Sequence, residues 1–98
     1  MMKTREEVLN ILRQARHDLS SRYPITRITL FGSYARGQQQ EDSDIDILID
    51  VDPSIGLRFV TLANELEGLL GQRVELVTSR AIAPKMKSLL EADSIEVA

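Results

Sequence analysis

The sequence feature that most constrains the fold is an alternating run from Asp44 to Val51. Successive side chains of a β-strand point to opposite faces, so Ile45, Ile47, Ile49 and Val51 share one face. This β-branched face is expected to be buried against helices. The run therefore predicts a central strand with one apolar face and one acidic face.

The acidic face of this strand begins with Asp44 and Asp46. Their attachment points lie about 7 Å apart on the same side, so both carboxylates can reach one divalent ion. They repel each other unless a cation joins them. Oxygen ligands of this kind suit Mg²⁺, which keeps several waters and is usually completed by substrate phosphates. Taken alone, alternating aspartates also fit the wet face of a half-buried sheet.

A Gly32-Ser33 pair follows a second apolar run, Ile25–Phe31, which we expect to be a strand. Glycine at a strand-to-helix turn allows a positive φ and a close approach to the backbone. Serine there can cap the helix and donate to a phosphate oxygen. The first amides of the following short helix, Tyr34–Gly37, favour an anion. We therefore expect a phosphate cradle beside an acid pair, as nucleotide chemistry requires.

Gly32-Ser33, ten intervening residues, then Asp44-Ile45-Asp46 resembles the signature of the DNA polymerase β-type nucleotidyltransferase superfamily. The string Gly-Ser-Tyr-Ala-Arg-Gly, followed by Ser-Asp-Ile-Asp in so short a chain, is similar to its minimal nucleotidyltransferase (MNT) members. The resemblance implies an α/β (α+β) fold with a small mixed sheet and helices packed on one face. It also implies that Gly32, Ser33 and nearby amides hold nucleotide phosphates, and that the two aspartates bind metal.

A third acid on a later strand completes the site in that superfamily. Glu75, in the alternating run Arg73–Val77, is the best candidate here, although the superfamily often has Asp at that position. It could bind a second metal ion or accept a proton from the attacking hydroxyl. An exposed strand glutamate is the competing interpretation.

Two further residues are candidates for nucleotide binding. Arg36 has two open roles, since it can reach phosphates or pair with Glu41 or Asp42. Ser43, immediately before the acids, can hold the loop by bonding local backbone. Tyr34 is expected to pack against the fold rather than stack on a base.

Helices are expected on either side of this centre. Thr4–Ser21 starts with a capping-box pattern and has apolar residues at helical spacing, with His17 on the solvated side. A second helix is expected from Leu57 to Leu70, ending at Gly71. Its expected buried side is Phe59, Val60, Leu62, Ala63, Leu66, Leu69 and Leu70. Ser79 can cap a last helix over 82–91, and Ser94–Val97 can add a short edge strand.

Composition limits the function classes. Ninety-eight residues predict one domain, 1–98, and no apolar run approaches a membrane span. A polar N-terminus unlike a signal peptide and the lack of cysteine fit a cytoplasmic setting. A net charge of −3 argues against strong direct nucleic-acid binding and weakens a tRNA-tailing role.

By resemblance, the chain transfers AMP from ATP, with Mg²⁺ expected as two ions, to a hydroxyl of a partner HEPN-domain ribonuclease toxin. That hydroxyl is expected to be a tyrosine's, and the chain then acts as an antitoxin in a hetero-oligomer. Two alternatives stay open: an antitoxin that neutralises its toxin by binding alone, and a small-molecule nucleotidyltransferase of the aminoglycoside-modifying kind. The latter usually needs a further domain or dimer partner. Base selectivity and the number of nucleotides transferred have no readable pattern.

Overall fold

The structure is a computed structural model that describes residues 3–83 and 93–97. The elements in chain order are α1 (Arg5–Arg22), β1 (Ile25–Phe31), α2 (Gly32–Arg36), β2 (Ile45–Val51) and the 3₁₀ turn η1 (Pro53–Ile55). They continue as α3 (Arg58–Leu70), β3 (Val74–Thr78), the 3₁₀ turn η2 (Ser79–Ala81) and β4 (Ile95–Glu96). Helices and a mixed sheet together confirm the predicted α+β class.

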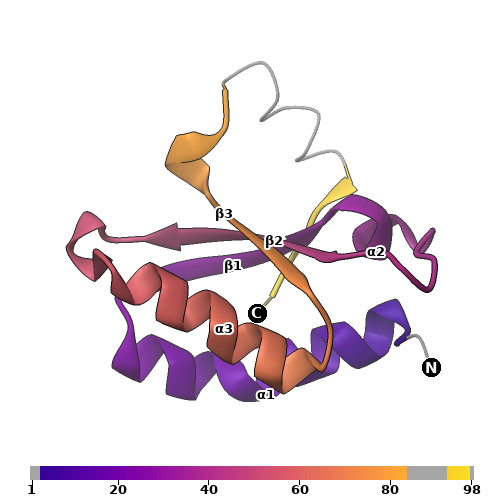
Figure 1. The fold of residues 1–98 in the computed structure, drawn as a ribbon, viewed down its shortest axis with the longest axis horizontal. Helices are drawn as coiled ribbons and strands as arrows, with labels where there is room; N and C mark the ends of the chain where they lie inside the picture. The colour runs from indigo at the N-terminus through magenta and orange to yellow at the C-terminus, as the bar shows by residue number, and fades with distance from the viewer. Residues whose placement is uncertain (1–2, 84–92, 98) are drawn as a thin grey trace.

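The strands form one sheet in the order β3-β2-β1-β4. β1 runs antiparallel to both β2 and β4, whereas β3 runs parallel to β2. The parallel pair needs a crossover connection, and α3 supplies it. α1 and α3 lie together on one side of the sheet, with η2 on the opposite side (Figure 1). The predicted arrangement of helices on one face is confirmed.

The isoleucine face of β2 is the centre of the core. Ile45, Ile47 and Ile49 have no exposed surface, and Ile28 and Leu30 of β1 are buried beside them. The two helices cover this face with further buried aliphatic residues: Val8, Leu9, Leu12 and Leu19 from α1, and Leu62, Leu66 and Leu70 from α3. The predicted split of β2 into an apolar and an acidic face is thus present.

α1 begins as its sequence predicts. The Thr4 hydroxyl accepts from the Glu7 amide, and the Glu7 carboxylate accepts from the Thr4 amide, which completes a capping box. Tyr23 ends the helix in an extended conformation. His17 is exposed, as expected.

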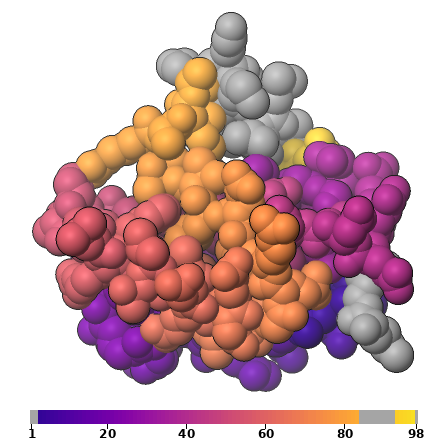
Figure 2. Space-filling model, in the orientation of Figure 1, coloured from indigo at the N-terminus to yellow at the C-terminus, as the bar shows by residue number. Residues whose placement is uncertain are grey.

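α3 departs from its predicted buried side. Val60 is 60% exposed and Leu69 43% exposed, although both were expected in the core, while Leu57, just before the helix, is 91% exposed. The core accepts a narrow stripe at four-residue spacing, so side chains on either side of that stripe face solvent. Figure 2 shows α3 and β3 forming much of the surface on this side.

The ends of α3 and β2 carry the predicted turn residues. Gly71 takes a left-handed conformation with φ 66° and ends α3 as expected. Asp52 accepts from the Ser54 amide and starts the turn that contains Pro53. The described residues contain no helix that is long and apolar enough to cross a bilayer.

The C-terminal predictions have mixed outcomes. The expected tail strand is present, because Ile95 and Glu96 pair with Leu30 and Thr29. Ser79 lies within η2 rather than at a cap, since Thr78 precedes that turn without a side-chain hydrogen bond. Most of the helix expected over 82–91 lies outside the described residues.

A polar cluster joins α1 to α3 at the outer end of the helix layer. Arg22 donates to Glu65 and to Asp18, and the Tyr23 hydroxyl donates to Glu65 at 3.1 Å. Arg22 lowers the pKa of Glu65 below its ordinary 4.5, with the Tyr23 hydroxyl adding to the effect and burial opposing it. The ionised carboxylate is therefore the form that the folded state favours.

Shortening the central isoleucine should destabilise the fold strongly. Ile47→Ala leaves a cavity between β2 and the helices, and its free energy of unfolding should fall by about 2–5 kcal/mol. Val60→Ala on the exposed side of α3 is the matched control and should change it by less than about 0.5 kcal/mol. Urea denaturation measures both; equal losses would contradict this description of the core.

Acid should weaken the Glu65 contacts. A depressed pKa contributes stability that is present above the unfolded-state value and is lost as pH falls through the folded-state value. Glu65→Gln should therefore be less stable than the wild type at pH 7, and the difference should shrink below about pH 4.5. Arg22→Gln should behave alike, and urea denaturation across pH 3–7 tests both. A difference independent of pH would exclude this linkage.

Candidate functional site

The open face of the sheet carries a cross-strand row of three residues. Phe31 of β1 pairs with Asp46 of β2, and Asp46 pairs with Glu75 of β3. Paired residues of neighbouring strands point to the same face, so these side chains share the side away from α1 and α3. The structure therefore brings Glu75 beside Asp46, as predicted for a third acid. We call Phe31, Asp46 and Glu75 the acid row.

Gly32 directly follows Phe31 in the chain and lies against the side chain of Asp46. Its φ is 74°, so the positive φ expected at this turn is present. A Cβ placed on Gly32 would lie 2.0 Å from Asp46 Oδ2, far inside any tolerated contact. The space that the missing side chain of Gly32 leaves open is thus occupied by the carboxylate of Asp46.

Ser33 does not cap the helix, contrary to prediction. α2 begins at Gly32, one residue before Ser33 and two before the expected Tyr34; Phe31 is its N-cap, without a side-chain hydrogen bond. The chain enters the helix directly from the strand, so Ser33 falls in the first turn. Its hydroxyl makes no capping bond.

Buried and polar contacts hold α2 in place. Tyr34 is completely buried, as expected, and its hydroxyl accepts from Gln72 Nε2 at 2.7 Å. Arg5 Nη1 donates to the Ala35 carbonyl at 3.3 Å, which ties α1 to α2. Gly37 ends the helix with φ 70°.

The loop between α2 and β2 contains the two remaining candidates. Ser43 Oγ accepts from the Gln40 amide at 2.9 Å, and the Ser43 amide donates to the Gln40 carbonyl at 3.0 Å. Its predicted role of holding local backbone is therefore present. Arg36 Nε donates to Gln38 Oε1 at 3.2 Å, and no ion pair joins it to Glu41 or Asp42 in this described loop. Of the two roles left open for Arg36, the pairing with Glu41 or Asp42 is therefore absent from this loop, and phosphate binding stays a prediction.

Asp46 is the electrostatic centre of the site. Burial raises its pKa above the ordinary value, and the Glu75 and Asp44 carboxylates raise it further, while Arg36 lowers it. The three acids predicted from the sequence, Asp44, Asp46 and Glu75, therefore interact electrostatically at this site. Negative charge on Asp46 is costly here until a cation enters.

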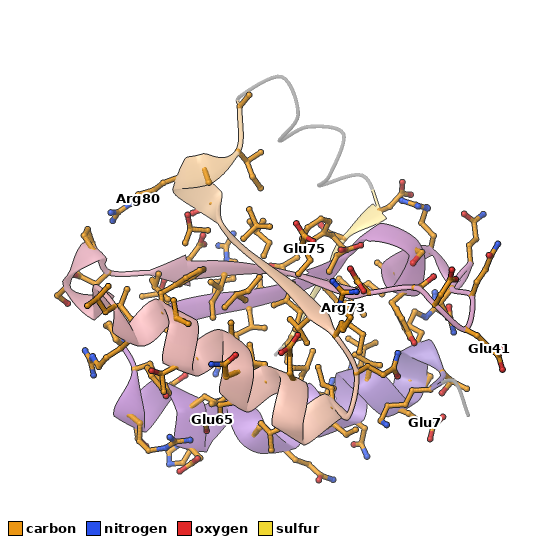
Figure 3. The ribbon with its side chains drawn as sticks, in the orientation of Figure 1. Glu7, Glu41, Glu65, Arg73, Glu75 and Arg80 are labelled. Atoms are coloured by element: carbon orange, nitrogen blue, oxygen red, sulfur yellow. The ribbon has the colours of Figure 1, made fainter. Side chains whose placement is uncertain are left out.

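Asp44 lies just before β2, whose first residue is Ile45. Its Oδ1 lies 3.9 Å from Nε of Arg73, the residue just before β3. No basic residue separates the two aspartates along the chain, but this arginine approaches from the segment that leads into the neighbouring strand. Figure 3 shows Arg73 and Glu75 along the same stretch of chain.

A hollow of about 420 Å³ lies beside the acid row. Its lining includes all three row residues and is otherwise apolar: Val77, Ala81, Ile82 and Ala83. Val77 pairs with Leu48, so this lining extends from the acid row in the direction away from Asp44. We call it the Glu75 hollow.

The donor set fits Mg²⁺ in its usual protein setting. The described residues contain no group of three acidic, histidine or cysteine side chains that would bind a metal ion unaided. Mg²⁺ is commonly held by one or two carboxylates and completed by substrate phosphates and water. Burial first, and then the Glu75 and Asp44 carboxylates, raise the pKa of Asp46, and a bound cation would offset this cost of its negative charge.

Comparison with known proteins adds a family to this geometry. The family described as Nucleotidyltransferase domain matches residues 12–96. The chain belongs to this nucleotidyltransferase family. A Methanocaldococcus jannaschii protein, provisionally named a protein adenylyltransferase, is 44% identical over 98 residues, covering 98% of this chain and 100% of the relative. The protein adenylyltransferase MntA of Thermococcus cleftensis is 45% identical over 83 residues, covering 83% of each chain.

Solved structures agree with membership of the nucleotidyltransferase family. One provisionally described as a minimal nucleotidyltransferase superposes with a TM-score of 0.78 at 36% identity, covering 95% of both chains. A toxin–antitoxin crystal structure with AMP-PNP gives 0.69 at 25% identity, covering 98% of this chain and 73% of that chain. A Shewanella oneidensis complex of a tri-AMPylated HEPN toxin with an MNT antitoxin gives 0.69 at 22% identity, covering 97% and 72%. This last likeness concerns the fold alone.

Sequence reasoning missed three features of this nucleotidyltransferase. They are the approach of Arg73 to Asp44, the contact of Gly32 with Asp46, and the participation of Phe31 in the hollow. Each depends on strand register, which links residues far apart in the chain. The only available sequence signal was that Arg73 stands two positions before Glu75 on an alternating strand.

Adding a methyl group at Gly32 should damage the site and the fold together. Gly32→Ala combines a positive φ with a collision against Asp46, so its free energy of unfolding should fall by at least about 1–3 kcal/mol. Gly68→Ala, inside α3 with nothing within 4 Å of the new Cβ, should instead gain up to about 1 kcal/mol. Chemical denaturation compares the two. Equal stability of Gly32→Ala and the wild type would overturn the proposed contact.

Proposed function

We propose that the chain is a protein adenylyltransferase antitoxin, which transfers AMP from ATP to a hydroxyl of a cognate HEPN toxin. The observation that carries this proposal is the acid row beside Gly32 and Ser33, in a chain 45% identical to the protein adenylyltransferase MntA. The row supplies carboxylates for metal-assisted phosphoryl chemistry.

Each candidate residue has a distinct role in this proposal. Asp44 and Asp46 hold Mg²⁺, and Glu75 completes the acidic site. Gly32, Ser33 and neighbouring amides bind the nucleotide phosphates, with Arg36 close enough to influence the charge of Asp46. Ser43 fixes the loop that delivers Asp44 through its two bonds with Gln40.

The two sides of the acid row fit the two ends of an in-line displacement. Gly32 continues β1 toward Asp44, whereas the Glu75 hollow extends along β3 in the opposite direction. The attacking and leaving oxygens of a phosphoryl transfer lie on opposite sides of the phosphorus. When the phosphates bind at Gly32 and Ser33, the hollow on the other side of the acid row is therefore available for the acceptor side chain.

At phosphorus, the transfer forms one bond and breaks one. The acceptor oxygen bonds to the α-phosphorus, the bond from that phosphorus to the bridging oxygen breaks, and pyrophosphate leaves with the electron pair. The acceptor's proton passes to the Glu75 carboxylate, which borders the hollow. Mg²⁺, expected as two ions and held by Asp44 and Asp46, would supply charge neutralisation for this displacement.

A tyrosine of the toxin is the proposed acceptor, because a phenol ring suits apolar walls with a carboxylate at the rim. The tri-AMPylated HEPN toxin bound to an MNT antitoxin, which shares this fold, supports the choice of partner. Acceptor and enzyme then meet in a hetero-oligomer, and the lack of cysteine fits a cytoplasmic location.

Loss of one acid should slow transfer strongly while the protein stays folded. With Mg²⁺, labelled ATP and a cognate HEPN protein as the proposed partner, the wild type should add AMP to that partner. Asp44→Asn and Asp46→Asn should each lower the rate by about a hundredfold or more. Intact mass spectrometry of the partner measures the product.

Asp50→Asn is the matched control, because Asp50 lies on the same face of β2 but outside the acid row and the hollow. It should transfer AMP at the wild-type rate. Full transfer by Asp46→Asn would refute the proposed mechanism. Inhibition of the toxin without any added mass would instead favour an antitoxin that acts by binding.

A further inference from the structure

The backbone of Arg73 is fixed near Asp44, at the end of the candidate site where Gly32 and Ser33 are proposed to bind phosphates. The Ile45 amide donates to the Arg73 carbonyl at 2.9 Å, and Ile45 pairs with Val74. Arg73 stands two residues before Glu75, so its side chain belongs to the open face. It therefore lies opposite Asp44, on the same end of the acid row as Gly32.

The side chain of Arg73 is only loosely held. It is 87% exposed, and its Nε lies 3.9 Å from Asp44 Oδ1, at the outer limit of an ion pair. An exposed pair of this length contributes little to folding. Its guanidinium can turn toward a new anion at little cost.

The charge balance of the site favours such an anion contact. Three carboxylates surround this end of the sheet, and nucleotide phosphates bring further negative charge. Arg36 already donates through Nε to Gln38. When Asp44 binds a metal cation, Arg73 loses its contact with Asp44, and its guanidinium becomes available to bind an anion beside that aspartate.

We infer that Arg73 is a phosphate-binding residue, which exchanges its contact with Asp44 for the terminal phosphates of a bound nucleoside triphosphate. The planar guanidinium can donate two parallel hydrogen bonds to phosphate oxygens, an arrangement that lysine cannot reproduce. This inference rests on the proposed nucleotide site. It adds a contact to the leaving pyrophosphate, which the acid row itself cannot bind without a cation.

Binding of AMP-PNP with Mg²⁺ to the isolated chain tests the inference without any transfer. In isothermal titration calorimetry, Arg73→Gln should weaken AMP-PNP binding about tenfold or more, as expected for a lost charge-assisted contact. Arg73→Lys should retain part of the affinity, because it keeps the charge. Arg80→Gln, an exposed arginine of η2 outside the acid row, should bind like the wild type.

A second nucleotide distinguishes phosphate binding from a general disturbance. AMP lacks the β- and γ-phosphates, so the wild type and Arg73→Gln should bind AMP with the same affinity. Unchanged AMP-PNP affinity in Arg73→Gln, or an equal loss for AMP and AMP-PNP, would overturn the inference and leave the proposed function standing. A wild type that binds neither nucleotide would instead remove the proposed function and this inference with it.

Discussion

Burial of the isoleucine face of β2 is the interaction on which the rest of the structure depends. Ile45, Ile47 and Ile49 can reach α1 and α3 only in one register, because a shift of one residue would turn the aspartates into the core. The same packing therefore decides which way Asp46 points. Stability and site geometry are consequences of one alternating pattern.

The second constraint is the close contact between Gly32 and Asp46. β1 and β2 pair so that Phe31 lies opposite Asp46, and the chain then turns into α2 immediately beside the carboxylate. Only a residue without Cβ leaves room for Asp46 Oδ2 at this turn. The Gly-Ser pair and the acid pair, separated by ten residues in the chain, thus form one unit in space.

Much of this arrangement could be predicted from the sequence, because periodicity and turn residues carry local information. The strand Ile25–Phe31, the capping box at Thr4 and the helix end at Gly71 all followed from short patterns. The buried side of α3 was overestimated, since Val60 and Leu69 are apolar but lie beside the stripe that the sheet can cover. How wide that stripe is depends on the partner surface, which the helix sequence does not contain.

The site shows the same division between local and long-range information. Asp44 and Asp46 are two residues apart, so their common face was readable, and Glu75 could be proposed from alternation and the family resemblance. The contact between Arg73 and Asp44 arises from parallel pairing of β3 with β2, which no local pattern specifies. Parallel pairing places the residue before β3 opposite the residue before β2. The fold therefore places the Arg73 guanidinium beside Asp44 and the Glu75 carboxylate beside Asp46, so the two aspartates have neighbours of opposite charge.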